Sequence, residues 1–97
     1  MGQLLCLAQS RRSDILEVLA RYHATNPRIF GSALRDDETL NSDLDLLVCL
    51  PTDMSLFDVV GLKHAIEDLL QRDVDLVSED ELHPRIRQRV IDEARPL

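Results

Sequence analysis

The segment SDLDLLVCL at residues 42–50 constrains the fold more than any other part of the chain. Its first half alternates acidic and apolar residues, and its second half is continuously apolar until Pro51. Alternation favours a strand with one open face, whereas continuity is typical of a strand buried on both faces. The segment therefore predicts a central strand that carries two carboxylates at its head and is covered on both faces in its second half.

Helical and strand patterns alternate around this segment. Apolar residues at three- and four-residue spacing predict a helix from residue 10 to about 24, extended back as far as Leu4, which Asn26-Pro27 ends. A short strand is expected at 28–30, ending at Gly31. A helical turn at 32–35 and a polar loop at 36–41 are then expected before the central strand.

A second helix is expected after Ser55, which can cap it together with Asp58. Its apolar face is traced by Leu56, Val59, Val60, Lys63, Ile66, Leu69 and Leu70. A strand at 74–77 follows, then a capping box of Ser78 and Glu81. The last helix is expected to begin at His83-Pro84 and to point Ile86, Val90, Ile91 and Ala94 inward. The order of strand, helix and strand predicts a crossover unit and an α/β fold, a small mixed sheet with helices packed on it.

Length and charge limit the class of protein. The 97 residues correspond to a single domain, 1–97, with an aliphatic core, because aromatic residues make up only 3%. The net charge of −7 argues against direct nucleic-acid binding, which depends on clustered Lys and Arg. Four arginines near the C-terminus are interpreted first as a solvated helix face and second as a partner surface: Arg85, Arg87, Arg89 and Arg95.

Cysteine usage and hydropathy indicate the compartment. Cys6 and Cys49 have no metal-ligand spacing, and no disulfide is expected between them. No signal core or membrane-spanning stretch is expected, so a cytoplasmic location with no membrane contact is the prediction. His23, His64 and His83 share no motif and are expected at the surface.

The carboxylates carry the chemistry of the central strand. Asp43 and Asp45 lie two residues apart and so share one face of the strand, while Leu44 and Leu46 face the other way. Two such charges repel by about 2 to 4 kcal/mol at an effective dielectric near 20, so a shared proton, a lysine or arginine, or a divalent cation has to offset them. Asp75 lies between apolar residues on its own strand and can join the pair if that strand lies beside residues 42–50. Oxygen ligands of this kind suit magnesium, and three acids can hold two ions.

Gly31 and Ser32 supply the second element of the candidate site. Glycine permits a tight turn and lets backbone N–H groups approach a phosphate, and the serine hydroxyl adds a donor. Taken alone, Gly31-Ser32 is more often a plain turn, Asp43 and Asp45 a solvated strand end, and Asp75 a partner of Arg72 or Lys63. Their joint spacing favours a phosphate and metal site instead.

These residues resemble the minimal nucleotidyltransferases of the DNA polymerase β-like superfamily. The pattern of that family is a Gly-Ser pair, a spacer of about ten residues, Asp-x-Asp, and a third acid on a later strand, here Gly31, Ser32, Asp43, Asp45 and Asp75. Arg35 matches the arginine that often follows the Gly-Ser pair by three, and Asp36 stands where glycine often follows it. The resemblance covers nearly the whole chain.

The resemblance implies transfer of AMP from ATP to a hydroxyl group with two Mg²⁺ ions. Asp43 and Asp45 would hold both ions, and Asp75 would help to hold one and accept the proton of the nucleophile. Gly31, Ser32 and Arg35 would bind the nucleotide phosphates.

Members of this family are often antitoxins paired with a HEPN-domain toxin, so the expected acceptor is a hydroxyl, such as a tyrosine, of that partner. A homo-oligomer or hetero-oligomer is compatible with the sequence. Two alternatives stay open: a non-catalytic antitoxin that neutralises its toxin by binding, and the small catalytic subunit of a two-chain enzyme that modifies a small molecule such as an aminoglycoside.

Overall fold

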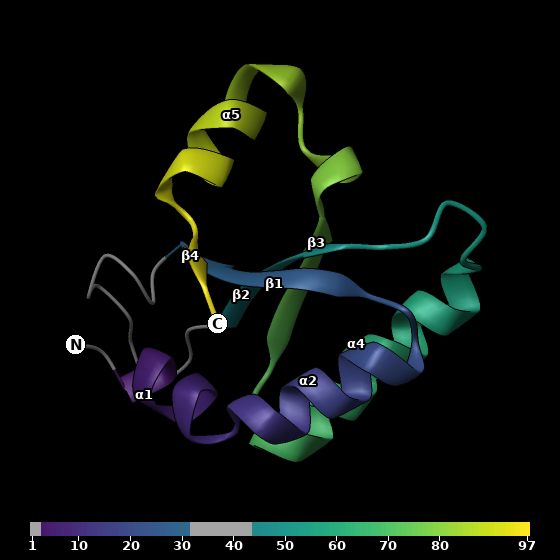
Figure 1. Cartoon of the computed structure of the whole chain (residues 1–97), viewed down its shortest axis with the longest axis vertical. Helices are drawn as coiled ribbons and strands as arrows, with labels where there is room; N and C mark the ends of the chain where they lie inside the picture. Colours follow the sequence, from purple (N-terminus) through teal and green to yellow (C-terminus); the bar gives the residue numbers. More distant parts are fainter. Residues whose placement is uncertain (1–2, 32–43) are drawn as a thin grey trace.

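The computed structural model of the chain describes residues 3–31 and 44–97, in which helices and strands alternate (Figure 1). The expected turn at 32–35 and loop at 36–41 lie outside the described residues. In chain order the elements are α1 (Gln3–Ser10), α2 (Arg12–Arg21), β1 (Thr25–Phe30), β2 (Leu44–Cys49), α4 (Leu56–Leu70), β3 (Val74–Ser78), the short 3₁₀ helix η1 (Glu79–Glu81), α5 (Pro84–Glu93) and β4 (Arg95–Pro96).

The four strands form one mixed sheet in the order β3-β2-β1-β4. β2 and β3 run parallel and are joined by α4, whereas β1 is antiparallel to both β2 and β4. Parallel neighbours need such a crossover connection, because a tight turn cannot bring the chain back to the same end of the sheet. The predicted α/β class, crossover unit and mixed sheet are confirmed.

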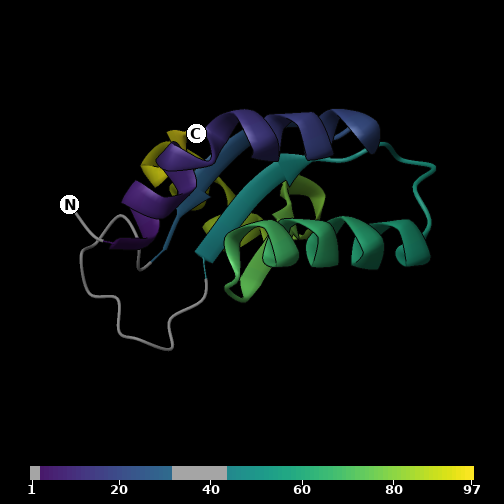
Figure 2. The same ribbon diagram turned by 90° about the horizontal axis from the view of Figure 1, so that it is seen from below.

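Helices α2 and α4 cover one face of the sheet, while η1 and α5 lie on the other side (Figures 1 and 2). The core between the sheet and α2 and α4 is aliphatic; its largest fully buried members include Ile15, Leu19, Ile29, Leu44, Leu46, Leu62 and Ile66. In β2, Leu46, Leu47 and Val48 are all fully buried. The prediction that this strand is covered on both faces in its second half is therefore confirmed.

The first predicted helix is wrong in its continuity. Instead of one helix over 10–24, α1 ends at Ser10 and α2 begins at Arg12. The Ser10 hydroxyl donates to the carbonyl oxygen of Leu7 at 2.8 Å, a local bond that competes with helix continuation. α2 ends at Arg21, and His23 adopts a left-handed φ of 59°, which turns the chain into β1.

Strand β1 begins at Thr25, three residues before the predicted start at Arg28. Asn26 has a φ of 54°, and the register with β2 shifts between Thr25 and Arg28. An irregularity of this kind accommodates Pro27 inside a strand, because proline has no N–H to donate to the ladder. The helix thus ends at Arg21, before the Asn26-Pro27 pair that was predicted to end it, and the pair lies inside the strand instead.

Helix α4 has the predicted cap but a different buried face. The Ser55 hydroxyl accepts a hydrogen bond from the backbone N–H of Asp58 at 3.1 Å, as expected. The buried residues are Leu62, Ile66 and Leu70, whereas Leu56 and Val60, predicted to face inward, are 79% and 42% exposed. Gly61 packs against Tyr22, the C-cap of α2. The first turn of α4 therefore extends past the end of α2 and, among the described residues, has no helix to pack against there.

The C-terminal region differs most from the prediction. His83 caps α5 through Nδ1 and Pro84 lies in its first turn, as expected, but Ser78 accepts from the N–H of Asp80 and caps η1 rather than forming a box with Glu81. No residue of α5 is buried: Ile86 is 47% exposed, and Val90, Ile91 and Ala94 are half-buried. Strand β4 was not predicted, and the backbone N–H of Leu97 beyond it donates to the carbonyl oxygen of Pro27 at 3.1 Å.

Candidate active site

Phe30, Asp45 and Asp75 lie side by side on three neighbouring strands, at the edge of the sheet where β2 and β3 begin. In the ladder between β1 and β2, Phe30 is the partner of Asp45, and in the parallel ladder between β2 and β3, Asp45 is the partner of Asp75. Partner positions on neighbouring strands lie about 5 Å apart and point to the same face. The structure thus brings Asp45 and Asp75 together, on the face opposite the one that α2 and α4 cover.

The flanking leucines fix the orientation of Asp45. Leu44 and Leu46 are 1% and 0% exposed and belong to the core, so Asp45, between them, projects to the other face, where it is half-buried. Asp75 lies between the buried Val74 and Leu76 and is itself exposed. Alternation along both strands therefore anchors the apolar side chains and presents the two carboxylates, as predicted.

Gly31 lies directly against the Asp45 carboxylate. Its φ is +77°, a left-handed conformation, and a Cβ placed on it would lie 2.0 Å from Oδ2 of Asp45. Both the backbone conformation and the space available therefore require glycine at this position. The absence of a side chain leaves the Gly31 backbone within reach of any group that the carboxylate holds.

The predicted alternative partners of Asp75 do not engage it. Between residues 44 and 97, no ion pair joins Asp75 to Lys63 or Arg72. Asp75 is exposed, so water screens its charge, and its position opposite Asp45 is the closest structural relation that the sheet gives it. This arrangement favours the ligand interpretation over the salt-bridge interpretation.

The two carboxylates fit a divalent cation in chemistry and in placement. Carboxylate oxygens are the ligands that Mg²⁺ prefers, and the Gly31 backbone, which carries no side chain, lies against one of the two carboxylates. The described ranges contain no cluster of three metal-binding side chains. Asp43, the predicted third ligand, lies outside them, as do Ser32 and Arg35.

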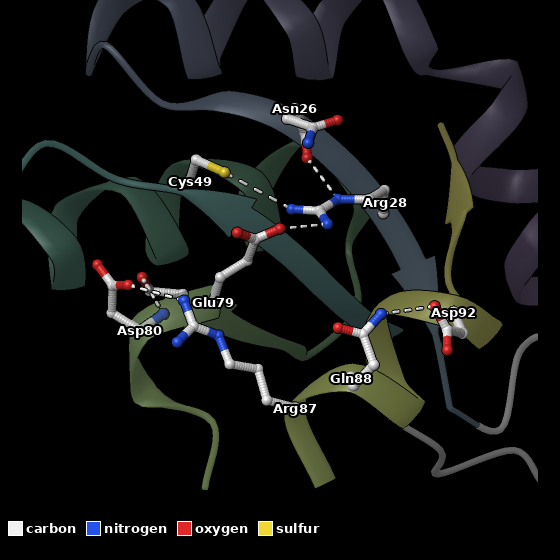
Figure 3. A network of polar contacts seen from close by, with 9 residues as sticks. Asn26, Arg28, Cys49, Glu79, Asp80, Arg87, Gln88 and Asp92 are labelled. Atoms are coloured by element: carbon white, nitrogen blue, oxygen red, sulfur yellow. Dashed lines mark hydrogen bonds and ion pairs between the residues drawn. The ribbon is translucent and has the colours of Figure 1, made fainter. Parts of the chain in front are cut away.

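An ion pair between Arg28 and Glu79 lies on the same face of the sheet as Asp45, toward the C-terminal ends of β2 and β3 (Figure 3). The sequence did not indicate this pair. The guanidinium group of Arg28 contacts the Glu79 carboxylate, donates to the carbonyl oxygen of Asn26 at 3.0 Å and approaches Sγ of Cys49 at 3.6 Å. The Arg28 side chain is only 8% exposed. A single arginine in a short strand with a partner 51 positions away gives no local pattern, so only the fold reveals this contact.

Several other predicted placements are confirmed. His23, His64 and His83 are exposed, and Cys6 and Cys49 are both free thiols. The four C-terminal arginines are exposed; Arg87 pairs with Asp80 at 3.2 Å and Arg89 with Glu93 at 3.3 Å. Within the described ranges, no helix is long and apolar enough to cross a membrane.

Comparison with known families agrees with the fold. The sequence model of the family described as "Nucleotidyltransferase domain" matches residues 13–97. A protein of Methanocaldococcus jannaschii named "Putative protein adenylyltransferase MJ0435" is 34% identical over 83 residues, which cover 86% of this chain and 89% of that protein. The chain belongs to the nucleotidyltransferase domain family.

Solved structures give the same result in three dimensions. One described as a "putative minimal nucleotidyltransferase" is 44% identical, with a TM-score of 0.84 over 100% of this chain and 97% of that chain. An MNT antitoxin solved in complex with a tri-AMPylated Shewanella oneidensis HEPN toxin has a TM-score of 0.68 at 20% identity, covering 91% of this chain and 69% of that chain. At that identity the second likeness concerns the fold alone. The expected class of enzyme, a nucleotidyltransferase, is confirmed.

Proposed function

We propose that this nucleotidyltransferase transfers AMP from ATP to a hydroxyl group of a HEPN-domain toxin, with release of pyrophosphate, and acts as the antitoxin of that toxin in the cytoplasm. The relative named as a protein adenylyltransferase supports a protein acceptor, and the likeness to an MNT antitoxin supports the partner. The free thiols Cys6 and Cys49 suit a reducing compartment. A tyrosine is the acceptor side chain that we favour.

The observation that carries the proposal is the pairing of Asp45 with Asp75 beside Gly31. Two carboxylates from adjacent strands lie on one face, and the Gly31 backbone, which carries no side chain, lies directly beside one of them. Magnesium ions bound there would neutralise the phosphate charge and stabilise the attacking and leaving oxygens of an in-line displacement. A solvated strand end would not need a glycine at which an added Cβ would lie 2.0 Å from a carboxylate oxygen.

Each residue has a defined part in this proposal. Asp43 and Asp45 hold both ions, and Asp75, which is exposed to an incoming acceptor, helps to hold one and takes the proton of the hydroxyl. The backbone of Gly31 and the hydroxyl of Ser32 bind the outer phosphates, and Arg35 supplies a positive charge to them.

Labelled ATP provides the direct test. The protein is incubated with Mg²⁺, ATP labelled in the α-phosphate and the HEPN-domain protein encoded beside it, and the intact mass of that partner is measured. We expect the partner to gain one or more AMP units. Asp45→Asn and Asp75→Asn should each lower the labelling rate by at least about 100-fold, because each removes a group that stabilises the transition state.

Asp73→Asn is the matched control. Asp73 is exposed and lies two residues before Asp75, and it contributes its backbone carbonyl to Leu44. The control should label the partner at the normal rate. If the Asp45 and Asp75 variants lose labelling but still neutralise the toxin, the non-catalytic antitoxin replaces our proposal; if only a small molecule is labelled, the two-chain enzyme does.

A further inference from the structure

The first turn of α4 carries an exposed apolar ridge, defined as Leu56, Phe57 and Val60. Their exposures are 79%, 87% and 42%, and Phe57 is one of only two phenylalanines in the chain. Large apolar side chains that gather in this way mark an interaction surface rather than ordinary surface composition. The ridge lies beyond the C-terminal end of β2, whereas Asp45 lies near its start, so the nucleotidyl-transfer chemistry does not use it (Figure 2).

A cavity of about 330 Å³ adjoins the ridge. Its apolar walls are Tyr22, Pro51 and Met54, and its charged lining comes from Arg21, Asp53 and Asp58. The cavity therefore lies between the end of α2, the segment after β2 and the first turn of α4. Its volume is at the lower end of the range for protein ligand pockets and is sufficient for one aromatic side chain.

The ridge and the cavity belong to one continuous surface. Phe57 on the ridge is followed directly by Asp58, which lines the cavity, and Met54 precedes the ridge by two residues. The same surface holds Arg21, which pairs with the exposed Glu17 at 3.0 Å, and two acids, Asp53 and Asp58, which no ion pair engages within the described ranges. A two-fold interface joins the same patch on both subunits, so a patch with a projection, an adjacent hollow and charges of both signs has the elements that such an interface needs.

We propose that this surface is covered by a second copy of the chain. Phe57 of one copy enters the cavity of the other and contacts Tyr22 and Met54 there, and the reverse contact forms by symmetry. Asp58 then lies near the partner's Arg21, which pairs opposite charges across the interface. Standard interfaces bury about 800 Å² on each partner, so the cavity walls as well as the ridge have to be covered.

The proposed dimer leaves the carboxylate pair open in each copy. Asp45 and Asp75 lie at the start of their strands, away from the end of β2 that leads into the interface. Dimerisation and nucleotidyl transfer can therefore be measured separately. A variant that no longer dimerises should still transfer the nucleotide, and a variant that no longer transfers it should still dimerise.

Sedimentation equilibrium of the full chain tests the proposal. We expect the wild-type protein to be a dimer at micromolar concentration. Phe57→Asp should raise the dissociation constant at least about 100-fold, because it removes a buried aromatic anchor from both halves of the interface. The variant should fold, since Phe57 is exposed and an acid in the first turn of a helix is favourable.

Ile86→Asp is the matched control, because Ile86 is also an exposed apolar residue in the first turn of a helix, at 47% exposure. It should leave the dimer intact. Equal loss of the dimer in both variants would show a general effect of charge and overturn the assignment of the interface.

Tryptophan fluorescence gives a second, independent readout. The chain contains no tryptophan, so Phe57→Trp introduces a single reporter. Its emission should move to longer wavelength on dilution, with a midpoint at the dimer dissociation constant, while Ile86→Trp should stay constant. The proposal would be overturned by a wild-type protein that is still monomeric at 100 times the micromolar concentration at which the dimer is expected. A Phe57→Trp emission that does not change on dilution would overturn it as well.

A HEPN-domain protein is the competing occupant, and the same variants identify it. If the wild-type chain is monomeric and Phe57→Asp abolishes binding to that protein, the ridge is the docking surface of the toxin and not of a second copy. AMP transfer by the Phe57 variant to a partner that still binds would leave the proposed function unaffected.

Discussion

At Gly31, the backbone conformation and the neighbouring carboxylate impose the same requirement. A φ of +77° disfavours any side chain, and Oδ2 of Asp45 occupies the position next to a Cβ. Gly61 is different: it lies in α4 with ordinary helical geometry, and a Cβ there would be 3.3 Å from the Tyr22 hydroxyl. The structure therefore requires glycine at position 31, whereas at position 61 it gives only one tight contact as a reason for glycine.

Gly31→Ala should abolish transfer more than it disturbs folding. The left-handed conformation costs an L-residue about 1 to 2 kcal/mol, so we expect the free energy of unfolding to fall by about 1 to 3 kcal/mol. Displacement of the Asp45 carboxylate by about 1 Å should lower the labelling rate by about 100-fold. Denaturant unfolding and the labelling assay measure the two effects on the same sample.

Gly61→Ala is the control for this substitution. Alanine in a helix interior is favoured over glycine by about 1 kcal/mol, and the Tyr22 hydroxyl has to yield by a few tenths of an ångström. The net change in unfolding free energy should stay within about 1 kcal/mol, with full labelling. Normal labelling by Gly31→Ala would contradict the role of the close contact with Asp45.

At the level of elements, the ion pair between Arg28 and Glu79 ties η1 to β1 across β2. Glu79 begins η1, which leads through Leu82 into α5, while β4 attaches the far end of α5 to β1. Helix α5 itself has no buried residue. Its position over the sheet therefore depends on these two attachments at its ends rather than on packing along its length.

Arg28→Met should lower the free energy of unfolding by about 2 to 4 kcal/mol, because it leaves the Glu79 carboxylate without its cation in a partly buried place. Glu79→Gln should cost less, since its side chain is 23% exposed and water can reach it. A double-mutant cycle should give a coupling energy of about 1 to 3 kcal/mol.

Arg89→Met provides the comparison for this cycle. Its pair with Glu93 has side chains 76% and 56% exposed, so its removal should change stability by no more than about 0.5 kcal/mol. Equal effects of Arg28→Met and Arg89→Met would show that the buried pair does not hold η1.

The elements that the sequence predicted well are those with local signals. Ser55 and His83-Pro84 mark helix starts by their own chemistry, and both start as predicted. The predicted face of α4 was wrong at Leu56 and Val60, because periodicity cannot show where a neighbouring helix ends. Strand β4 was missed because its two residues form a strand only through their pairing with β1.

For the molecule as a whole, the sheet places two like charges at partner positions, and among residues 3–31 and 44–97 no ion pair engages Asp75. At about 5 Å and an effective dielectric near 20 the repulsion is about 3 kcal/mol, and the exposure of Asp75 reduces it to about 1 kcal/mol. A cation bound between the two carboxylates would offset this repulsion.

Asp75→Asn should accordingly raise the melting temperature when divalent ions are absent. A gain of about 1 kcal/mol corresponds to roughly 4 to 8 °C in a domain of this size. Mg²⁺ at 10 mM should raise the melting temperature of the wild-type protein, by linkage, and should have a smaller effect on the variant. Calorimetry with and without Mg²⁺ measures both shifts, and a variant less stable than wild type without Mg²⁺ would contradict the repulsion.

The sequence predicted that Asp75 lies near Asp45 only on the condition that their two strands are neighbours. Alternation along residues 42–50 and 74–77 indicated which side chains leave the core, but only the parallel register makes the two acids partners. The roles of Ser32, Arg35 and Asp43 stay predictions. The Arg28–Glu79 pair could not be predicted, because nothing local links residues so distant in sequence.

The parallel register also makes spacing as important as residue type in this chain. Asp75 reaches Asp45 only after α4 and a short return that includes Gln71 in a left-handed conformation, and the carboxylate of Glu67 accepts from the N–H of Val74 at 3.0 Å at the strand entry. A slip of one residue in β3 would turn Asp75 into the core and bring a valine or leucine to the open face. In related sequences, length variation should therefore collect at 51–55, before α4, while the stretch from Glu67 to Asp75 keeps its length.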